Sequence, residues 1–399
     1  MPIKFDRILW ILPNSSGNLI YESLIKGIEM LGATVSPFYY REEVLCLGIT
    51  GVRNRILKAI DEFKPDLVLS SFYSDTYELS PEFLREISSK APLVVFPSDD
   101  KLYGTYETVY FVQSADAVMT EDPISKAVYD AMSIPTVFST HFIRHFINPL
   151  PTDSQEIDVS FVGDCEKADR SEFIQFLREN GINVSTFGLG SENGFVSRME
   201  MLKIMSMSKI NLNFSKFDLH KEVLNVEPWR GQMRQFKGRP VEIAQMKSFC
   251  LSEFSGDLES IFTIGSEVDA FHDKEELLEK VKYYLGNDAK REEMASRAFE
   301  RVKRDYEDQD SLRKDFNLLH EKLHKKRGKT KRAPVFRSFE FNVSEVKSNF
   351  FIFVKLLQLR RYTLALGTIP YFLKFDLSSF IGLWRAAAEL TSKIFFGRK

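Results

Sequence analysis

Cysteine is scarce in this sequence, and its few copies form no pattern. Only three cysteines occur in 399 residues, namely Cys46, Cys165 and Cys250, and none lies in a pair with the spacing of zinc ligands. This small, odd-numbered set excludes a disulfide framework and a cysteine-based structural zinc site. Because proteins of a reducing compartment use cysteine in this way, we expect a cytoplasmic protein.

Long hydrophobic runs are missing as well. The first residues are polar, and the apolar run that follows, residues 8–12, is short enough to be interpreted as one buried strand. No run approaches the roughly 18 apolar residues that a transmembrane helix needs. We therefore expect neither a secretory signal nor a membrane-spanning helix.

Several familiar catalytic motifs are absent too. The sequence contains no GxGxxG, Walker loop, HExxH or GxSxG, so dehydrogenase, NTPase, metalloprotease and hydrolase interpretations lack support. Asp99 and Asp100 resemble an Asp-x-Asp metal clamp, but Lys101 occupies its third position, and we expect no metal. The two carboxylates follow a buried strand, where they can hold an acceptor hydroxyl or act as a base. The alternative is a helix N-cap or a turn.

The residues that are present describe a globular protein. Hydrophobic residues make up 44% and charged residues 28% of the chain, and the length suits two α/β domains with an extension. The net charge of −2 is unevenly distributed. Residues 322–399 hold 17 Lys and Arg against 4 Asp and Glu, a net of +13, so the rest of the chain carries −15.

A basic tail on an acidic body indicates an anionic partner. We expect no nucleic acid, and assign residues 333–399 to an anionic membrane surface, which makes the protein peripheral on the inner face of a membrane. Aromatic side chains lie among the basic ones, at Phe351, Phe353, Trp384, Phe395 and Phe396. The alternative is packing of this tail on the acidic body or on another subunit.

The first 150 residues alternate short apolar runs with amphipathic stretches. The runs are continuous rather than alternating, which predicts a parallel sheet covered on both faces. The expected strands are residues 8–12, 34–39, 67–70, 92–96, 117–120 and 136–138, and the expected helices include 52–63 and 82–88.

The second half repeats this rhythm after a proline-containing linker at residues 149–154. Its expected strands are residues 157–162, 184–187, 210–214 and 249–252, and its helices are 170–180, 199–206, 240–246, 274–285 and 291–306. We therefore predict domains at residues 1–150 and 151–320, and a basic helical extension at 321–399. Residues 311–326 are expected to form a helix that crosses back onto the first half.

The most informative segment is residues 237–259. It predicts a basic loop, a helix with Pro240 near its first position and an acid in its first turn, and then a short strand. Lys237 and Arg239 beside a helix N-terminus suit a diphosphate, because the helix dipole and the amide donors add to their charge. Glu242 can accept hydrogen bonds from ribose hydroxyls.

This segment, with residues 265–267 and a helix ending in Tyr283-Tyr284-Leu285, resembles the C-terminal half of GT-B glycosyltransferases. The nearest group is the spore-maturation (CgeB-like) branch of the group 1 transferases. Upstream, residues 160–163 with Arg170, and residues 209–214, resemble the other donor-side signatures of that family. The likeness covers residues 157–316. It implies an α/β GT-B fold, with two Rossmann-like doubly wound domains facing a cleft.

The resemblance also implies roles for single residues. Glu242 matches the second Glu of the family's Glu-x7-Glu motif and would bind ribose, whereas Arg234 stands in place of the first Glu. Arg239 would neutralise the diphosphate leaving group. The remaining donor-binding candidates are Gly163, Arg170, Gly188, Asn213, Lys237 and Glu259.

The acceptor side matches no motif. His141, near the end of the first half, is a candidate base, although a packed or exposed histidine is the commoner case. Our hypothesis is a metal-independent transferase that moves a sugar from a nucleotide-diphosphate donor, its substrate rather than a cofactor, to a glycan, lipid-linked or protein acceptor. Group 1 membership implies retention of configuration, and Arg234 weakens that expectation. The alternatives are a nucleotide-sugar epimerase and an inactive GT-B-like scaffold.

Overall fold

The structure is a computed structural model of the chain, and it describes most of the residues. The described residues are 3–13, 19–72, 77–97, 100, 107–139, 149–150, 155–167, 169–216, 234–236, 238–305, 309–326, 336–374 and 376–395.

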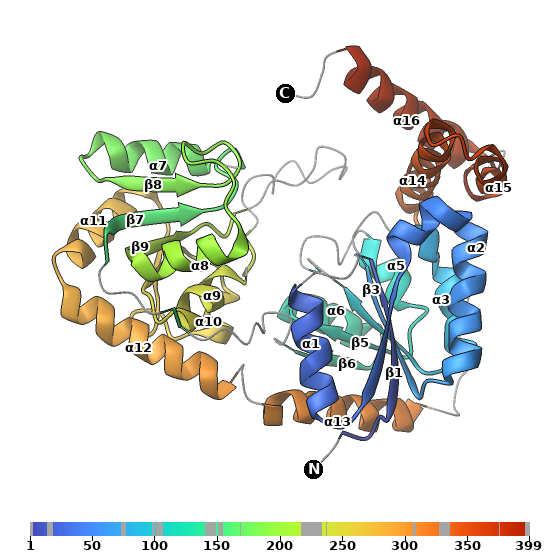
Figure 1. Cartoon of the computed structure of the whole chain (residues 1–399), viewed down its shortest axis with the longest axis horizontal. Coiled ribbons are helices and arrows are strands. Elements are labelled where there is room, and N and C mark those ends of the chain that lie inside the picture. Colours follow the sequence, from blue (N-terminus) through green and yellow to red (C-terminus); the bar gives the residue numbers. More distant parts are fainter. Residues whose placement is uncertain are drawn as a thin grey trace. The chain divides into compact units, whose positions relative to one another are not determined.

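The chain divides into two compact units (Figure 1). Unit 1 comprises Met1–Phe142 and Leu312–Lys399, and unit 2 comprises Ile143–Ser311. The sequence placed its boundaries after residues 150 and 320 and treated the last 79 residues as a separate part. In the structure, the C-terminal extension belongs to the same compact unit as the N-terminal half.

Unit 1 contains a six-stranded parallel sheet in the order β2-β1-β3-β4-β5-β6. Its strands are β1 (Arg7–Leu12), β2 (Thr34–Tyr39), β3 (Leu67–Phe72), β4 (Leu93–Pro97), β5 (Ala117–Thr120) and β6 (Thr136–Phe138). Its N-terminal helices are α1 (Leu19–Met30), α2 (Tyr40–Phe63), η1 (Tyr77–Leu79), α3 (Pro81–Lys90), α5 (Val109–Val112) and α6 (Pro123–Ala131).

Both faces of this sheet are buried, as the continuous apolar strands predict. Along β1, Leu9 and Ile11 enter one hydrophobic cluster, which includes residues of α2 and α3. Ile8 and Trp10, which alternate with them, enter a second cluster that includes residues of α1. Side chains of a strand alternate between its two faces, so one short strand contributes to both cores.

Helix α13 (Gln309–Lys326) completes the second of these cores. Leu312, Phe316, Leu319 and Leu323 recur at intervals of three and four residues, so they share one helix face, and all four are buried in the cluster with Trp10. The prediction that residues 311–326 cross back onto the first half is confirmed.

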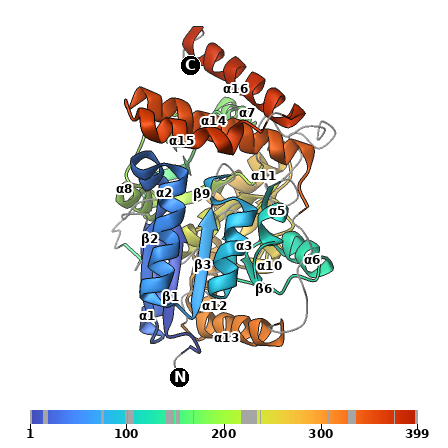
Figure 2. The same ribbon diagram turned by 90° about the vertical axis from the view of Figure 1, so that its right-hand side faces the viewer.

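Three further helices, α14 (Phe339–Gln358), α15 (Tyr362–Phe372) and α16 (Leu377–Phe395), form the C-terminal extension. Phe341 of α14 is buried in the core beside α3 and α5. Arg361 donates a hydrogen bond to the carbonyl of Leu45 in α2 at 2.5 Å. Figures 1 and 2 show α14 and α15 lying beside α2. The extension is therefore anchored to unit 1.

Residues 369–396, an apolar stretch in the sequence, do not form one helix. The helix breaks after Phe372, and α16 begins at Leu377. Asp376 explains the new start, because its Oδ1 accepts hydrogen bonds from the backbone N–H of Ser379 at 2.8 Å and from the hydroxyl of Ser378 at 2.7 Å.

Unit 2 contains a five-stranded parallel sheet in the order β11-β10-β9-β7-β8. Its strands are β7 (Ile157–Val162), β8 (Val184–Phe187), β9 (Ser208–Asn213), β10 (Cys250–Glu253) and β11 (Asp269–Phe271). Its helices are α7 (Arg170–Glu179), α8 (Arg198–Met207), α9 (Arg239–Gln245), α10 (Leu258–Ile261), α11 (Lys274–Leu285) and α12 (Asp288–Asp305).

Helices cover both faces of this second sheet. One hydrophobic cluster joins the strands to α7 and α11, and the other joins them to α8, α9, α10 and α12. Each half of the chain is therefore a doubly wound α/β unit, as predicted. Among the described residues, no helix is both long enough and apolar enough to span a bilayer.

Candidate functional site

The carboxyl ends of the unit 2 strands gather most of the candidate residues. All five strands are parallel, so Gly163, Gly188, Asn213 and Glu253 end or follow their strands at the same edge of the sheet. Helices α8 and α9 begin at this edge too, because each one leads back to the start of the next strand. Ligands of such sheets bind at this edge.

Glu253 is the central carboxylate of the edge. Its side chain is fully buried. Its Oε2 accepts hydrogen bonds from the backbone N–H of Ser215 at 3.0 Å and of Lys216 at 2.8 Å, and its Oε1 accepts one from Nε of Arg234 at 3.1 Å. Glu253 therefore fixes the chain where it leaves β9 and again at residue 234.

Sequence reasoning did not single out Glu253. The available signal is the acid that ends an otherwise uncharged buried strand, Cys250-Leu251-Ser252-Glu253. The ion pair between Arg234 and Glu253 shows what Arg234 contacts. Arg234 stands where the resembling family has its first Glu, and here its guanidinium neutralises the buried Glu253.

A second cluster joins α8 to α9. Glu242 lies in the first turn of α9. Its Oε2 lies 2.7 Å from Nη1 of Arg239, and its Oε1 lies 3.1 Å from Nη1 of Arg198. The sulfur of Met201 also contacts Arg239. One carboxylate thus holds two guanidiniums, and the three groups carry a net charge of +1.

Arg198 is the residue of this cluster that sequence reasoning missed. It occupies the first position of α8, directly after a capping box made by Ser197 and Glu200. Its Nε and Nη2 are buried and have no hydrogen-bond acceptor within the described part of the chain. Native structures rarely leave buried donors unpaired, and these two donors on one guanidinium can hydrogen-bond to an anion.

Asn213 is buried at the end of β9. Its Nδ2 donates a hydrogen bond to Oγ of Ser252 at 2.8 Å, across the pair that the two residues form between β9 and β10. This contact caps the strand end and occupies one amide donor of Asn213.

Arg170 begins α7 and is buried. Its Nη1 donates a hydrogen bond to the carbonyl of Asp164 at 2.8 Å, and its guanidinium lies 5.7 Å from the ring centroid of Phe161. Arg170 therefore holds the loop after β7 in place.

Gly163 and Gly188 approach each other rather than an open surface. Gly188 has a φ of +116°, and a Cβ on it would lie 2.2 Å from the carbonyl oxygen of Gly163. The N–H of Gly163 also donates to the carbonyl of Phe187 at 2.8 Å. Only glycine fits at position 188, because the two loops pack backbone against backbone.

Glu259 lies on α10 with its side chain exposed. Asp257, two residues earlier, is buried instead. Its Oδ2 accepts a hydrogen bond from the N–H of Phe236 at 3.2 Å. Lys237, Asp99 and His141 lie outside the described residues.

In unit 1, Asp100 is a buried carboxylate with hydroxyl partners. Thr120 and Tyr129 donate to its two oxygens, each at 2.6 Å. Burial is the main cause that raises the pKa of Asp100 to about 6, with a smaller contribution from the negative charge of Asp122. Burial and the neighbouring Asp100 likewise raise the pKa of Tyr129. These contacts describe a packing role, with both oxygens occupied.

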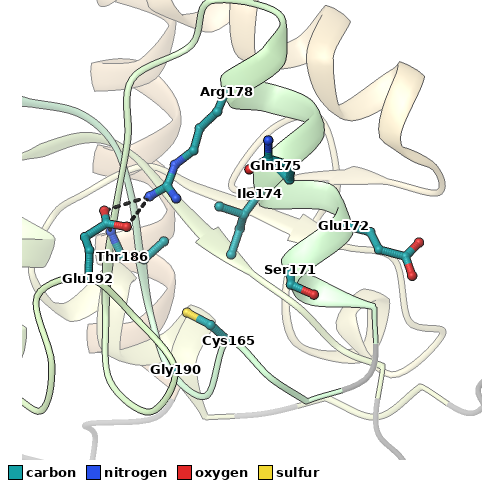
Figure 3. Close-up of a pocket in the computed structure, with 9 residues that line it drawn as sticks. All are labelled: Cys165, Ser171, Glu172, Ile174, Gln175, Arg178, Thr186, Gly190 and Glu192. Carbon is teal, nitrogen blue, oxygen red and sulfur yellow. Dashed lines mark hydrogen bonds and ion pairs between the residues drawn. The ribbon is translucent and has the colours of Figure 1, made fainter.

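A pocket of about 450 Å³ opens beside α7 at the β8 edge of the sheet. Figure 3 shows Arg178 and Glu192 joined on one wall, where Nη2 lies 2.6 and 2.7 Å from the two carboxylate oxygens, with Cys165 and Gly190 at the opposite end. Burial raises the pKa of the Cys165 thiol. None of the predicted site residues lines this pocket.

Comparison with known proteins places these features in a family context. Residues 167–314 match the family model described as "Glycosyl transferase-like". A search of curated proteins gives no significant match.

Solved structures resemble the chain over most of its length. HepE from Anabaena, determined in complex with UDP, is 12% identical with a TM-score of 0.51, over 80% of this chain and 100% of that one. Sucrose-phosphate synthase from Thermosynechococcus elongatus is 10% identical with a TM-score of 0.56, over 80% and 99%. A glycosyltransferase from Rickettsia africae is 11% identical with a TM-score of 0.55, over 81% and 100%.

At these identities the likeness shows the fold. Two parallel Rossmann-like sheets and a helical C-terminal extension confirm the predicted α/β GT-B class. The chain thus has the fold of GT-B glycosyltransferases, and its residues 167–314 match a glycosyl transferase-like domain.

Proposed function

We propose that this protein is a nucleotide-sugar glycosyltransferase whose donor diphosphate binds at Arg198 and Arg239. The observation that carries the proposal is the pair of buried Arg198 donors, Nε and Nη2, that no described residue accepts. They lie in a cluster of net charge +1 at the edge where such sheets bind ligands. A guanidinium fork matches phosphate oxygens, so a diphosphate is the anion that suits this cluster.

The comparisons support this proposal without testing it residue by residue. HepE was determined with UDP and, in a second structure with a TM-score of 0.51, with UDP and glucose. We extend that ligand class to this chain. The narrower likeness to the CgeB-like branch, hexosyl transfer and retention of configuration remain parts of the proposal that come from sequence.

In the proposed reaction, the bond between the anomeric carbon and the diphosphate oxygen breaks, and a bond from an acceptor hydroxyl forms. The leaving diphosphate gains negative charge, which Arg198 and Arg239 neutralise, so no metal is required for this step. Glu242 orients both guanidiniums. The acceptor, a glycan or lipid-linked hydroxyl, loses its proton to a base that the described residues do not identify.

Isothermal titration with UDP, GDP and CMP tests the donor site. We expect one nucleoside diphosphate to bind, and Arg198→Ala to weaken it by about 10- to 100-fold, because a hydrogen bond to a charged group contributes about 1.5–3 kcal/mol. Arg297→Ala is the matched control, since Arg297 is an exposed arginine of unit 2 paired with Glu293. Equal affinity of the Arg198→Ala and control variants would reject the site.

Product analysis separates the alternatives. Incubating the protein with UDP-glucose and candidate acceptors should release UDP only when an acceptor is present. A new sugar isomer without an acceptor would indicate an epimerase. Failure of every nucleotide to bind would indicate a scaffold with this fold.

A further inference from the structure

The C-terminal extension has an unusual distribution of side chains on α16. The face that packs on α14 carries small residues, namely Ser378, Ser379, Gly382 and Ala386, all buried. The approach is close, because a Cβ on Gly382 would lie 2.7 Å from Cγ1 of Val346. The inner face of α16 is thus filled by residues with little apolar surface.

The outer face of α16 carries the large apolar residues instead. Leu377, Phe380 and Trp384 are 66%, 72% and 66% exposed, and they recur at intervals of three and four residues, so they lie along one stripe. A helix of a water-soluble bundle normally has the reverse arrangement. An exposed stripe of this kind marks an interaction surface.

A second set of exposed apolar residues lies at the end of α14 and the start of α15. Leu359, Tyr362 and Leu366 are exposed there. Arg360 lies between them in the chain, Lys355 lies just before them, and both are exposed as well. Basic groups interleaved with aromatic and aliphatic side chains are typical of helices that lie at a membrane surface.

The charges of the extension leave a positive surplus. Each of its four described acids already has a partner. Glu340 pairs with Arg385, Glu345 with Arg337 and Lys374, and Glu389 with Lys347, while Asp376 caps α16. Within the described residues, Lys355 and Arg360 have no carboxylate partner. The described surface therefore keeps two positive charges that no described acid compensates.

We propose that the outer surface of α14–α16 binds an anionic lipid bilayer, with Leu377, Phe380 and Trp384 entering the headgroup region. Anionic headgroups supply the charge that Lys355 and Arg360 lack, and the bilayer boundary buries the apolar stripe. A second copy of the chain fits less well, because a two-fold interface would bring the same basic residues together. This proposal is independent of the proposed function, since it requires no donor.

Vesicle flotation of the full chain tests the charge requirement. We expect stronger binding to phosphatidylcholine vesicles that contain phosphatidylglycerol than to phosphatidylcholine alone. Replacing both Lys355→Gln and Arg360→Gln should lower the partition coefficient on anionic vesicles by about 30-fold, since each basic residue near the surface contributes about 1 kcal/mol. The control replaces Lys203→Gln and Lys282→Gln, two exposed lysines of unit 2, and should bind like the natural chain.

A second pair of variants tests the apolar stripe. Phe380→Ser with Trp384→Ser should lower binding by at least about tenfold, because two large side chains no longer leave water. Leu189→Ser with Phe195→Ser, which changes two exposed apolar residues of unit 2, should have no effect. Circular dichroism confirms that each variant is folded, and only exposed positions are changed.

The fluorescence of Trp384 can show whether this side chain enters the bilayer. Brominated lipids should quench its fluorescence in a Trp229→Phe background, because the other tryptophan left, Trp10, is buried in unit 1. Adding Trp384→Phe to that background should remove the quenching while flotation persists. Equal binding to neutral and anionic vesicles, or unchanged binding of the Phe380/Trp384 variant, would overturn the proposal. A dimer without lipid that this variant abolishes would assign the stripe to a second copy instead.

Discussion

The two sheets each hold one buried carboxylate near their carboxyl ends, and the two carboxylates have different partners. In unit 2, Glu253 receives two backbone N–H groups and the guanidinium of Arg234. In unit 1, Asp100 receives the hydroxyls of Thr120 and Tyr129. One edge therefore pairs its buried carboxylate with a cation, whereas at the other edge burial raises the pKa of the carboxyl.

This difference between the two carboxylates indicates which sheet edge suits an anion. Unit 2 pairs its buried acid with a cation and places Arg198 and Arg239 around Glu242 at the same edge, so the edge keeps positive charge that suits a phosphate. Around Asp100, burial raises the pKa to about 6, because no described cation offsets the cost of desolvation. The donor site that we propose in unit 2 and the hydroxyl contacts of Asp100 fit the same electrostatic argument.

The largest expected effect comes from removing the carboxylate of unit 2. Glu253→Ala leaves the N–H groups of Ser215 and Lys216 and the charge of Arg234 without their acceptor. Breaking such a buried pair from one side costs about 3–5 kcal/mol in the free energy of unfolding. Hydrogen exchange at unit 2 amides and urea denaturation would measure it, and nucleotide binding should be lost as well.

The matched control is Glu259→Ala. Glu259 is an exposed acid six residues further along the same unit, so its replacement should change the free energy of unfolding by less than about 0.5 kcal/mol. A similar loss of stability in both variants would contradict the distinction between buried Glu253 and exposed Glu259.

The second effect concerns unit 1. Asp100→Ala leaves the buried hydroxyls of Thr120 and Tyr129 without an acceptor, and each unpaired group costs about 1–3 kcal/mol. We therefore expect a loss of about 3 kcal/mol in the free energy of unfolding, with nucleotide binding to unit 2 retained. Loss of nucleotide binding with normal stability would instead give Asp100 a direct part in the site.

The sequence predicts most of the fold, because its strands are short apolar runs with clear ends. Strands β2, β5, β6, β7 and β8 and helix α11 have the predicted bounds. Helix α2 begins twelve residues earlier than expected, since Gly48, at φ 68° and ψ 173°, bends it and interrupts its pattern. The start of α16 is set by the cap at Asp376, which acts through local hydrogen bonds that apolar periodicity does not reveal.

The site is predicted less completely, for a physical reason. Arg239 and Glu242 are close in sequence, so helix position and family resemblance both find them. Arg198 and Glu253 act through partners 44 and 19 residues away, respectively, and no local pattern reveals such pairs. Asn213 and Arg170 were found as site candidates, and their contacts are explained by loop and strand packing.

The third effect is a pH dependence centred on Asp100. Its pKa is raised from 3.8 to about 6 on folding, so the folded state binds the proton more tightly. The resulting stability is fully present below the unfolded pKa and is lost as the pH rises through about 6. Relative to Asp100→Asn, whose amide does not titrate, the natural chain should gain about 1 kcal/mol between pH 7 and pH 5. Parallel pH profiles of the two proteins would contradict this.

The smallest effect tests whether Asn213 belongs to the packing or to the donor site. Asn213→Ala removes one hydrogen bond to Ser252, whose hydroxyl also contacts the carbonyl of Glu253 at 2.9 Å. We expect a loss of about 0.5–1 kcal/mol in the free energy of unfolding, the usual contribution of a single hydrogen bond. Calorimetric titration should show the nucleotide affinity unchanged. A tenfold weaker nucleotide affinity at nearly normal stability would show that Asn213 contributes to donor binding. The proposed donor site would then include the end of β9.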